Sequence, residues 1–93
     1  MDEAAITAAW SGIPEWTRVG DTIERTYRFA TFPDAIGFTR RVADAAEAAN
    51  HHPDIDIRYR TVRLVWTTHD AGGLTDRDFQ LARTCDRIAS SSI

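Results

Sequence analysis

The sequence predicts one α+β domain over residues 1–93, with the element order αββαββα and a four-stranded antiparallel sheet covered on one face by helices. Three observations support this fold class. The chain of 93 residues is long enough for one modest hydrophobic core and no second one. Apolar residues recur at helical spacing in three segments and alternate with polar residues in the segments between them. The alternating segments form two adjacent pairs, and consecutive hairpins build an antiparallel sheet.

The first segments predict a short helix and a hairpin. Residues 2–10 can form the helix, and Pro14 ends its pattern. Strands are predicted over residues 16–19 and 22–29, on either side of Gly20-Asp21, a dipeptide compatible with a tight turn. The inward face of the second strand is expected to carry Ile23, Tyr27 and Phe29, with Arg25 as an interruption.

The strongest helical signal begins at Thr31. Asp34 follows three residues later, a pattern that caps a helix N-terminus, and Pro33 is tolerated in a first turn. The helical pattern ends before Asn50, and alanines on its buried stripe allow close packing on a sheet. The expected stripe consists of Ala35, Phe38, Val42, Ala45, Ala46 and Ala49.

The next two predicted strands alternate apolar and polar residues. Their inward sets are odd-numbered in the first strand and even-numbered in the second, and a two-residue turn at Arg60-Thr61 explains the switch. This register pairs Tyr59 with Val62, which makes Tyr59 a core residue, and its extension sets His69 opposite His52. The expected inward residues are Ile55, Ile57 and Tyr59, then Val62, Leu64 and Trp66.

The last helix is predicted after the flexible turn Ala71-Gly72-Gly73. Thr75 and Asp78 repeat the capping pattern at its start, and Ser90 to Ile93 are expected to form a frayed tail. Its inward residues are expected to be Phe79, Leu81, Ala82, Cys85 and Ile88. Three tryptophans are further core candidates, of which the second can also flank a flat ligand from an edge strand: Trp10, Trp16 and Trp66.

The composition excludes several classes of function. All 11 basic residues are arginine, 14 residues are acidic and the net charge is -3, so nucleic acid is not expected as a partner. No apolar run approaches the roughly 20 residues of a membrane span, and the N-terminus is acidic where a signal peptide is basic. The lone Cys85 cannot form an internal disulfide. We therefore expect a cytoplasmic protein with no membrane partner.

Three histidines are the candidates for chemistry. Histidine ordinarily has a pKa of about 6.5, so it can donate or accept a proton near neutrality. The adjacent His51 and His52 can simply satisfy the last carbonyls of the preceding helix, but their expected meeting with His69 favours a site. Three imidazoles can also hold zinc. Adjacent residues seldom point at one metal and no cysteine supports such a site, so no metal is expected.

Two carboxylates lie near the predicted histidine cluster. Glu47 precedes His51 by one helical turn and can reach or orient its ring, although a solvated helix residue is the simpler interpretation. Asp78 completes the cap begun by Thr75, which is a sufficient structural reason for a carboxylate there. A carboxylate at a helix N-terminus near histidines can also face a ligand.

A longer motif surrounds these residues. It comprises Glu47-Ala-Ala-Asn-His51-His52-Pro53-Asp54, then Tyr59, Val62, Thr68-His69-Asp70, Gly72-Gly73-Leu74-Thr75 and Asp78. Upstream of it lie Phe29, Phe32, Ala35, Phe38, Val42, Ala43 and Ala46-Glu47. Together these residues closely resemble the pterin-4a-carbinolamine dehydratase family over nearly the whole chain. The spacing from His-His-Pro to Thr-His, taken with Gly-Gly-Leu-Thr, is the most specific part of the resemblance.

The resemblance implies a hydro-lyase that dehydrates 4a-hydroxytetrahydropterin to quinonoid dihydropterin and water, in tetrahydrobiopterin recycling. It implies that His51 and His69 are the acid-base pair and that His52 chiefly binds the pterin within the same catalytic group. Glu47 and Asp78 match acidic positions that bind substrate or orient a histidine. No cofactor is implied, because two positioned imidazoles supply both proton transfers.

Three departures from the family pattern alter the walls of the expected site and leave the histidines untouched. Ala48 stands where lysine is common, Ile55 where tryptophan is common, and Ile57 where asparagine is frequent. The preferred pterin side chain is therefore not implied.

The resemblance also leaves a second class of function open. Family members dimerise and can bind other proteins through helices, so the same fold can serve as a non-catalytic interaction or assembly module. The three histidines and two carboxylates favour the enzyme. Exposed sheet edges and the small size of the domain predict a homodimer or homotetramer.

Overall fold

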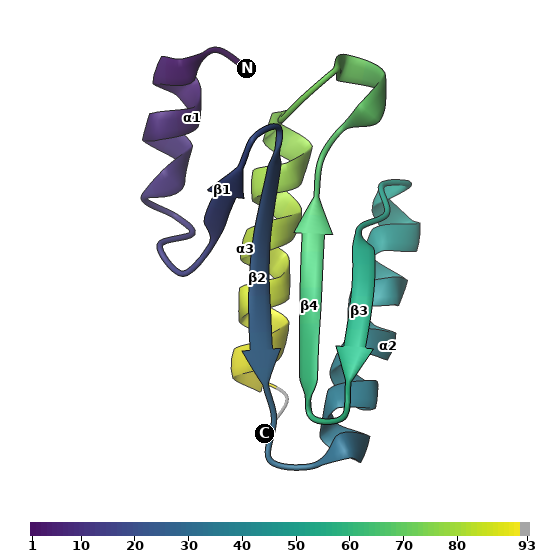
Figure 1. The fold of residues 1–93 in the computed structure, drawn as a ribbon. Coiled ribbons are helices and arrows are strands. Elements are labelled where there is room, and N and C mark those ends of the chain that lie inside the picture. Colours follow the sequence, from purple (N-terminus) through teal and green to yellow (C-terminus); the bar gives the residue numbers. More distant parts are fainter. Residues whose placement is uncertain (92–93) are drawn as a thin grey trace.

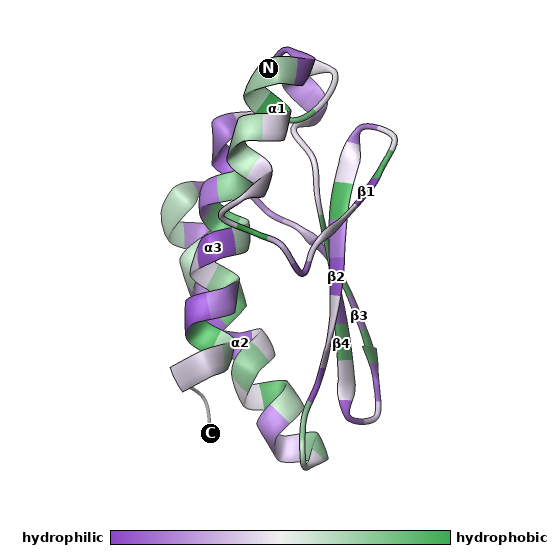
Figure 2. Ribbon diagram, turned by 90° about the vertical axis from the view of Figure 1, so that its left-hand side faces the viewer, coloured by the Kyte–Doolittle hydropathy of each residue, from purple (hydrophilic) through white to green (hydrophobic). Residues whose placement is uncertain are grey.

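Three helices pack against one face of a four-stranded antiparallel sheet, which confirms the predicted fold class and element order. The computed structural model describes residues 1–91. Figure 1 shows the strands side by side, and Figure 2 shows the helices on one side of them. The elements are α1 (Glu3–Trp10), β1 (Thr17–Val19), β2 (Thr22–Arg28), α2 (Phe32–Ala49), β3 (Asp54–Arg58), β4 (Thr61–Trp66), the 3₁₀ turn η1 (His69–Ala71) and α3 (Asp76–Ser91).

The order of strands in the sheet is β1-β2-β4-β3. Each hairpin pairs its own strands, and the two hairpins join where β2 lies antiparallel to β4. The second strand of the second hairpin, β4, is therefore an inner strand of the sheet, and its first strand, β3, lies at the edge. The face that β4 turns toward the helices is completely buried, at Val62, Leu64 and Trp66.

Side-chain caps begin the first two helices. Asp2 accepts a hydrogen bond from the Ala5 amide at 2.8 Å, and the Thr31 hydroxyl accepts one from the Asp34 amide at 3.1 Å. Both bonds satisfy amides that a helix leaves unpaired in its first turn. The predicted start of α2 at the Thr31 capping pattern is therefore confirmed.

Arg25, which interrupts the inward face of β2, has a partner beneath the sheet. Its guanidinium contacts the Asp86 carboxylate on α3 at 2.9 Å, and the Trp16 indole N–H and the Tyr27 hydroxyl donate to the same carboxylate. Burial, with a smaller contribution from Asp86, raises the pKa of Tyr27 well above its usual range. Trp16 is 3% exposed and belongs to the core, not to a ligand platform.

The register predicted for the second hairpin is wrong by two residues. The turn is at Tyr59 and Arg60, and Ile57 pairs with Val62 where Tyr59 was expected. Tyr59 has a left-handed φ of 54° and is 70% exposed, so it is a turn residue and not part of the core. A shift of two residues keeps the same side chains on the same face, so alternation alone cannot detect it.

Three other residues predicted for the core are exposed, and one of them is Ala49 at the end of α2. Ile55 and Ile57 are 38% and 37% exposed, because β3 is the edge strand of the sheet. The predicted frayed tail is helical at Ser90 and Ser91, while Ser92 and Ile93 lie outside the described residues. Within residues 1–91, none of the helices has both the length and the apolar character needed to cross a membrane.

Candidate active site

The end of α2 points the two adjacent histidines in different directions. Asn50 adopts a left-handed conformation with φ 50° and ψ 44°, and the His51 amide donates back to the Ala46 carbonyl at 3.1 Å. This tight termination turns His51 toward the core, where the residue is 8% exposed. The side chain of His52 points outward and is 57% exposed.

A buried carboxylate holds His51. The side chain of Asp78 is fully buried, and its Oδ1 lies 2.6 Å from His51 Nε2. A carboxylate only accepts hydrogen bonds, so Nε2 carries the hydrogen of the neutral ring. Nδ1, which makes no hydrogen bond to a side chain of residues 1–91, is therefore the nitrogen left for a ligand.

The second oxygen of Asp78 is also fully engaged. Oδ2 accepts hydrogen bonds from the Thr68 hydroxyl at 2.8 Å and from the Thr75 amide at 2.9 Å. The Thr68 hydroxyl has one proton, so the Thr75 hydroxyl, 2.8 Å away, must donate to it. Asp78 thus supplies the carboxylate half of the predicted cap of α3 and links that helix both to the end of β4 and to His51.

The Trp66 ring packs against the His51 ring. The two rings stack with centroids 5.5 Å apart and planes inclined by 24°. Trp66 is completely buried, and its indole N–H has no hydrogen-bond partner within the described residues. Together the indole face and the Asp78 carboxylate restrict the orientation of the His51 ring.

Glu47 contacts a different histidine from the one expected. Its Oε1 accepts a hydrogen bond from His52 Nε2 at 2.7 Å, so it orients His52 and not His51. The Glu47 side chain is 80% exposed, and this bond is therefore weak in water. The spacing of one helical turn gave the wrong partner because the chain has already left the helix at Asn50.

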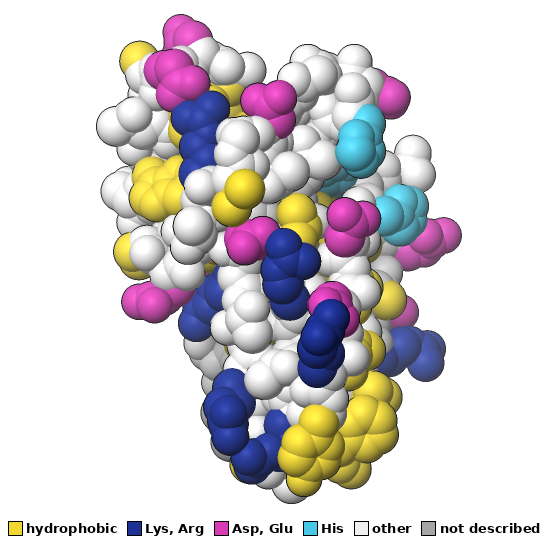
Figure 3. Space-filling model, in the orientation of Figure 1, with side chains coloured by type: hydrophobic (Ala, Val, Ile, Leu, Met, Phe, Trp, Pro, Cys, Tyr) yellow, Lys and Arg dark blue, Asp and Glu magenta, His cyan; other side chains and the backbone are white. Residues whose placement is uncertain are grey.

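The third histidine, His69, begins η1 just beyond β4 and is exposed. It completes a hollow of about 290 Å³, which we call the histidine hollow. Figure 3 shows histidine side chains gathered at one end of the molecule with acidic side chains beside them. The residues that line the histidine hollow are Asn50, His51, His52, Thr67, Thr68, His69, Asp70 and Arg77.

Sequence reasoning did not assign roles to Arg77 or Thr68. The Arg77 guanidinium donates to the carbonyls of Ala49 at 2.9 Å and Asn50 at 2.7 Å, which fastens the end of α2 to the start of α3. The one sequence signal that could have indicated Arg77 is its place inside the helix-capping pattern, which sets a cation beside the start of a helix. Across residues 1–91, no group of three or more His, Cys, Asp or Glu side chains is arranged to hold a metal ion.

Comparison with known proteins assigns the sequence to a family. The family model described as pterin 4 alpha carbinolamine dehydratase matches residues 1–88. The chain belongs to the pterin 4 alpha carbinolamine dehydratase family. The predicted resemblance is therefore confirmed over residues 1–88, a range that contains the three histidines of the hollow.

Individual members of the pterin 4 alpha carbinolamine dehydratase family are similar along their full length. A proposed pterin-4-alpha-carbinolamine dehydratase of Nocardia farcinica is 53% identical over 89 residues, covering 96% of this chain and 94% of the relative. One from Chloroflexus aurantiacus is 54% identical over 88 residues, covering 95% of each.

Two solved structures share the fold of this chain. A crystal structure of a transcriptional coactivator/pterin dehydratase from Brucella melitensis has a TM-score of 0.91 at 31% identity, covering 96% of this chain and 97% of that one. A pterin dehydratase-like protein identified as a RuBisCO assembly factor in the α-carboxysome has a TM-score of 0.71 at 16% identity, covering 84% and 93%. The second likeness concerns the fold alone.

Proposed function

We propose that this protein dehydrates 4a-hydroxytetrahydropterin to quinonoid dihydropterin and water, as a hydro-lyase in tetrahydrobiopterin recycling. The observation that carries the proposal is the histidine hollow, in which three imidazoles surround one space and the most buried of them is held by Asp78. The reaction removes the 4a-hydroxyl group as water and a proton from the neighbouring ring nitrogen, forming a carbon–nitrogen double bond. Both steps are proton transfers.

His51 is assigned the role of general base. Its Nε2 donates to Asp78, so Nδ1 takes the proton from the pterin nitrogen beside the 4a carbon. The buried Asp78 carboxylate stabilises the imidazolium that forms. Asp78 acts on the substrate through His51, because it is fully buried and both its oxygens are engaged by the protein. It is a positioning residue in this assignment, in place of the direct substrate contact expected from the sequence.

His69 is assigned the role of general acid, delivering a proton to the departing hydroxyl. It is exposed, so it can regain that proton from water after each turnover. His52, oriented by Glu47, lines the same hollow and binds the edge of the pterin ring. The reaction neither oxidises nor reduces the substrate, and the proposed mechanism uses these side chains without a cofactor.

Rapid mixing with freshly generated 4a-hydroxytetrahydropterin tests this proposal, with the spontaneous dehydration as baseline. We expect His51→Ala and His69→Ala to lose roughly 10²- to 10⁴-fold in kcat, the usual contribution of one proton-transfer group. His52→Ala should mainly raise KM. Gln80→Ala, an exposed change on α3 outside the histidine hollow, is the matched control and should behave like the wild type.

Failure of the wild-type protein to accelerate dehydration would overturn the enzyme proposal and favour an interaction or assembly module on this fold. Such a module predicts that the histidine variants retain binding to the partner protein. Loss of wild-type activity after treatment with a chelator would instead revive the zinc interpretation of the three imidazoles. The test therefore separates the three readings.

We also propose that the protein forms a homodimer, or a tetramer built from it, through the outer edge of β3. This edge pairs with no strand in residues 1–91 and carries the half-exposed Ile55 and Ile57. Antiparallel pairing of two copies around Asp56 places each Asp54 opposite an Arg58, which is favourable in charge. Sedimentation should show a species larger than 10.4 kDa, and Ile57→Lys should shift it toward the monomer. A wild-type monomer at all concentrations contradicts this assembly.

A further inference from the structure

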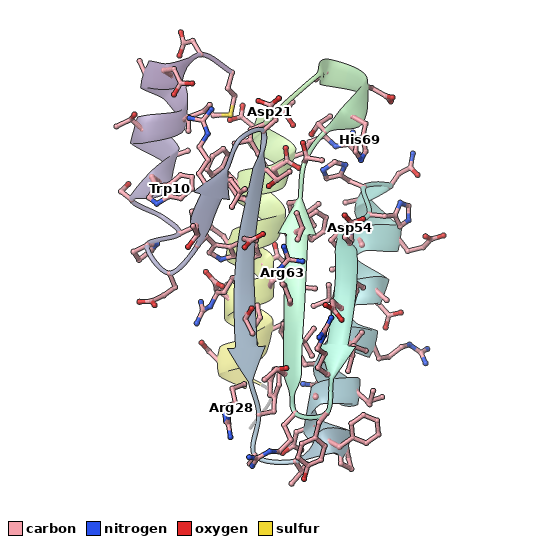
Figure 4. The ribbon with its side chains drawn as sticks, in the orientation of Figure 1. Trp10, Asp21, Arg28, Asp54, Arg63 and His69 are labelled. Carbon is pink, nitrogen blue, oxygen red and sulfur yellow. The ribbon has the colours of Figure 1, made fainter. Side chains whose placement is uncertain are left out.

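A second hollow adjoins the histidine hollow at the same end of the sheet. Its volume is about 290 Å³. Thr67 and His69 line both hollows, so the two meet along these side chains. Figure 4 shows Asp21 at the turn between β1 and β2 and His69 just beyond β4, both at this end of the molecule. The lining consists of Asp21, Thr22, Thr67, His69, Gly72 and Gly73.

Both walls of this second hollow are fastened to the end of β4. The Thr67 hydroxyl donates to the Asp21 carbonyl at 2.6 Å, which ties down the β1–β2 turn. On the other side, Thr68 and Gly73 exchange backbone hydrogen bonds of 3.2 and 3.3 Å. The space between the turn and the glycine loop is therefore set by the fold.

The polar groups of the second hollow are mostly hydrogen-bond acceptors. The Asp21 carboxylate accepts no hydrogen bond from residues 1–91, and the nearby charge of Arg18 is taken up by an ion pair with Glu3 at 2.7 Å. The hydroxyls of Thr22 and Thr67 donate to backbone carbonyls, so each offers its lone pairs to the hollow. Such a lining suits a ligand group that donates, such as an alcohol.

We infer that the second hollow receives a hydroxylated side chain of the pterin, with the Asp21 carboxylate accepting a hydrogen bond from a side-chain hydroxyl. The inference rests on the proposed dehydratase function and adds a basis for substrate preference. A ring in the histidine hollow directs its substituent past His69, where the two hollows meet. A site built to bind a hydroxyl discriminates against a substrate that lacks one, because the carboxylate then has no hydrogen-bond donor on the substrate.

Two substrates test the inference: the 4a-hydroxy derivatives of tetrahydrobiopterin, which has a dihydroxypropyl side chain, and of 6-methyltetrahydropterin, which has no side-chain hydroxyl. We expect Asp21→Ala to lower kcat/KM roughly tenfold or more for the hydroxylated substrate, the usual effect of losing a hydrogen bond to a charged group. The methyl substrate should change by less than about twofold. Asp44→Asn, an exposed carboxylate on α2 outside both hollows, is the matched control.

Gly73→Ala is an independent variant that leaves every charge in place. A Cβ at this position lies 3.5 Å from Asp21 Oδ1, an ordinary contact, and Gly73 does not have the positive φ that excludes alanine. The added methyl narrows the second hollow without disturbing the fold. It should lower kcat/KM for the hydroxylated substrate and spare the methyl substrate.

Each outcome has one meaning. Equal loss on both substrates, no loss in either variant, or equal wild-type kcat/KM for the two substrates overturns the side-chain assignment while the dehydratase proposal stands. A wild type that accelerates neither substrate overturns the dehydratase proposal itself. Selective loss on the hydroxylated substrate in both variants supports the assignment.

Discussion

Replacing Asp78 by asparagine reverses the hydrogen bonding of His51 with almost no change in shape. Asp78 Oδ2 accepts from both Thr68 and the Thr75 amide, so the single oxygen of asparagine must take that position. The amide NH₂ group then faces His51 Nε2, which has to become an acceptor. The ring hydrogen moves to Nδ1, and the nitrogen assigned as general base no longer has a lone pair.

The size of the effect follows from the bonds that are lost. Removing one general base costs roughly 10² to 10⁴ in rate, or about 3 to 5 kcal/mol of activation free energy. The 2.6 Å bond to a fully buried carboxylate is also replaced by a neutral one, at a cost of about 1 to 3 kcal/mol of unfolding free energy. A domain of this size melts about 4 to 8 °C lower per kcal/mol, so Asp78→Asn should remain folded at room temperature with a lower Tm.

Two measurements check this reasoning. Rapid-mixing dehydration gives kcat, and nitrogen chemical shifts of the His51 ring report which nitrogen carries the hydrogen. Asp76→Asn is the matched control, since Asp76 is an exposed carboxylate in the same first turn of α3. It should keep wild-type kcat and lose only about 0.3 to 1 kcal/mol from the helix dipole.

A folded Asp78→Asn protein that keeps kcat within about threefold of the wild type would refute the base assignment, because the proton-transfer term is far larger than that. An Nε2 hydrogen on His51 in this variant would refute the tautomer argument on its own. The first result would mean that Asp78 serves the fold of α3 and not the chemistry.

Three other changes have expected outcomes of different sizes. Glu47→Gln should change kcat/KM by less than about threefold, since its bond to His52 is exposed; a hundredfold loss would contradict this. Asp86→Ala should lower the free energy of unfolding in urea by about 2 to 4 kcal/mol, because Arg25 and two other donors lose their acceptor; an unchanged midpoint would contradict it. Burial raises the pKa of Cys85 to about 12. The thiol of the unfolded chain has a pKa near 9.0, so above that pH the unfolded state ionises while the folded state does not. Relative to Cys85→Ala, the wild type should therefore lose about 1.4 kcal/mol of unfolding free energy per pH unit between pH 9.0 and about 12. Below pH 9.0 the two proteins should show no such difference. Parallel pH dependence in the two proteins would show that this thiol is not buried in solution.

The sequence by itself determined the elements, because their signals are local. The Thr31 cap and the helical spacing after it place α2, and strict alternation places β4. These patterns depend on side chains within one or two turns of each other, or on neighbours along one strand. The three histidines were found in the same way, as a motif with fixed spacing, and they do line one hollow.

Tertiary structure alone decided the hairpin register and the partners of the site residues. Moving the turn from Arg60 and Thr61 to Tyr59 and Arg60 takes Tyr59 out of the core but leaves the other inward side chains of the hairpin on the same face, so alternation with a period of two does not detect the shift. The contact between His51 and Asp78 joins residues that are 27 apart in the chain, so no local sequence pattern reveals it. It exists because α2 and α3 pack on the same face of the sheet, with the end of one helix beside the start of the other. Local spacing predicted that Glu47 contacts His51. The left-handed turn at Asn50 instead directs His51 inward, to the Asp78 carboxylate of α3, and leaves Glu47 to His52.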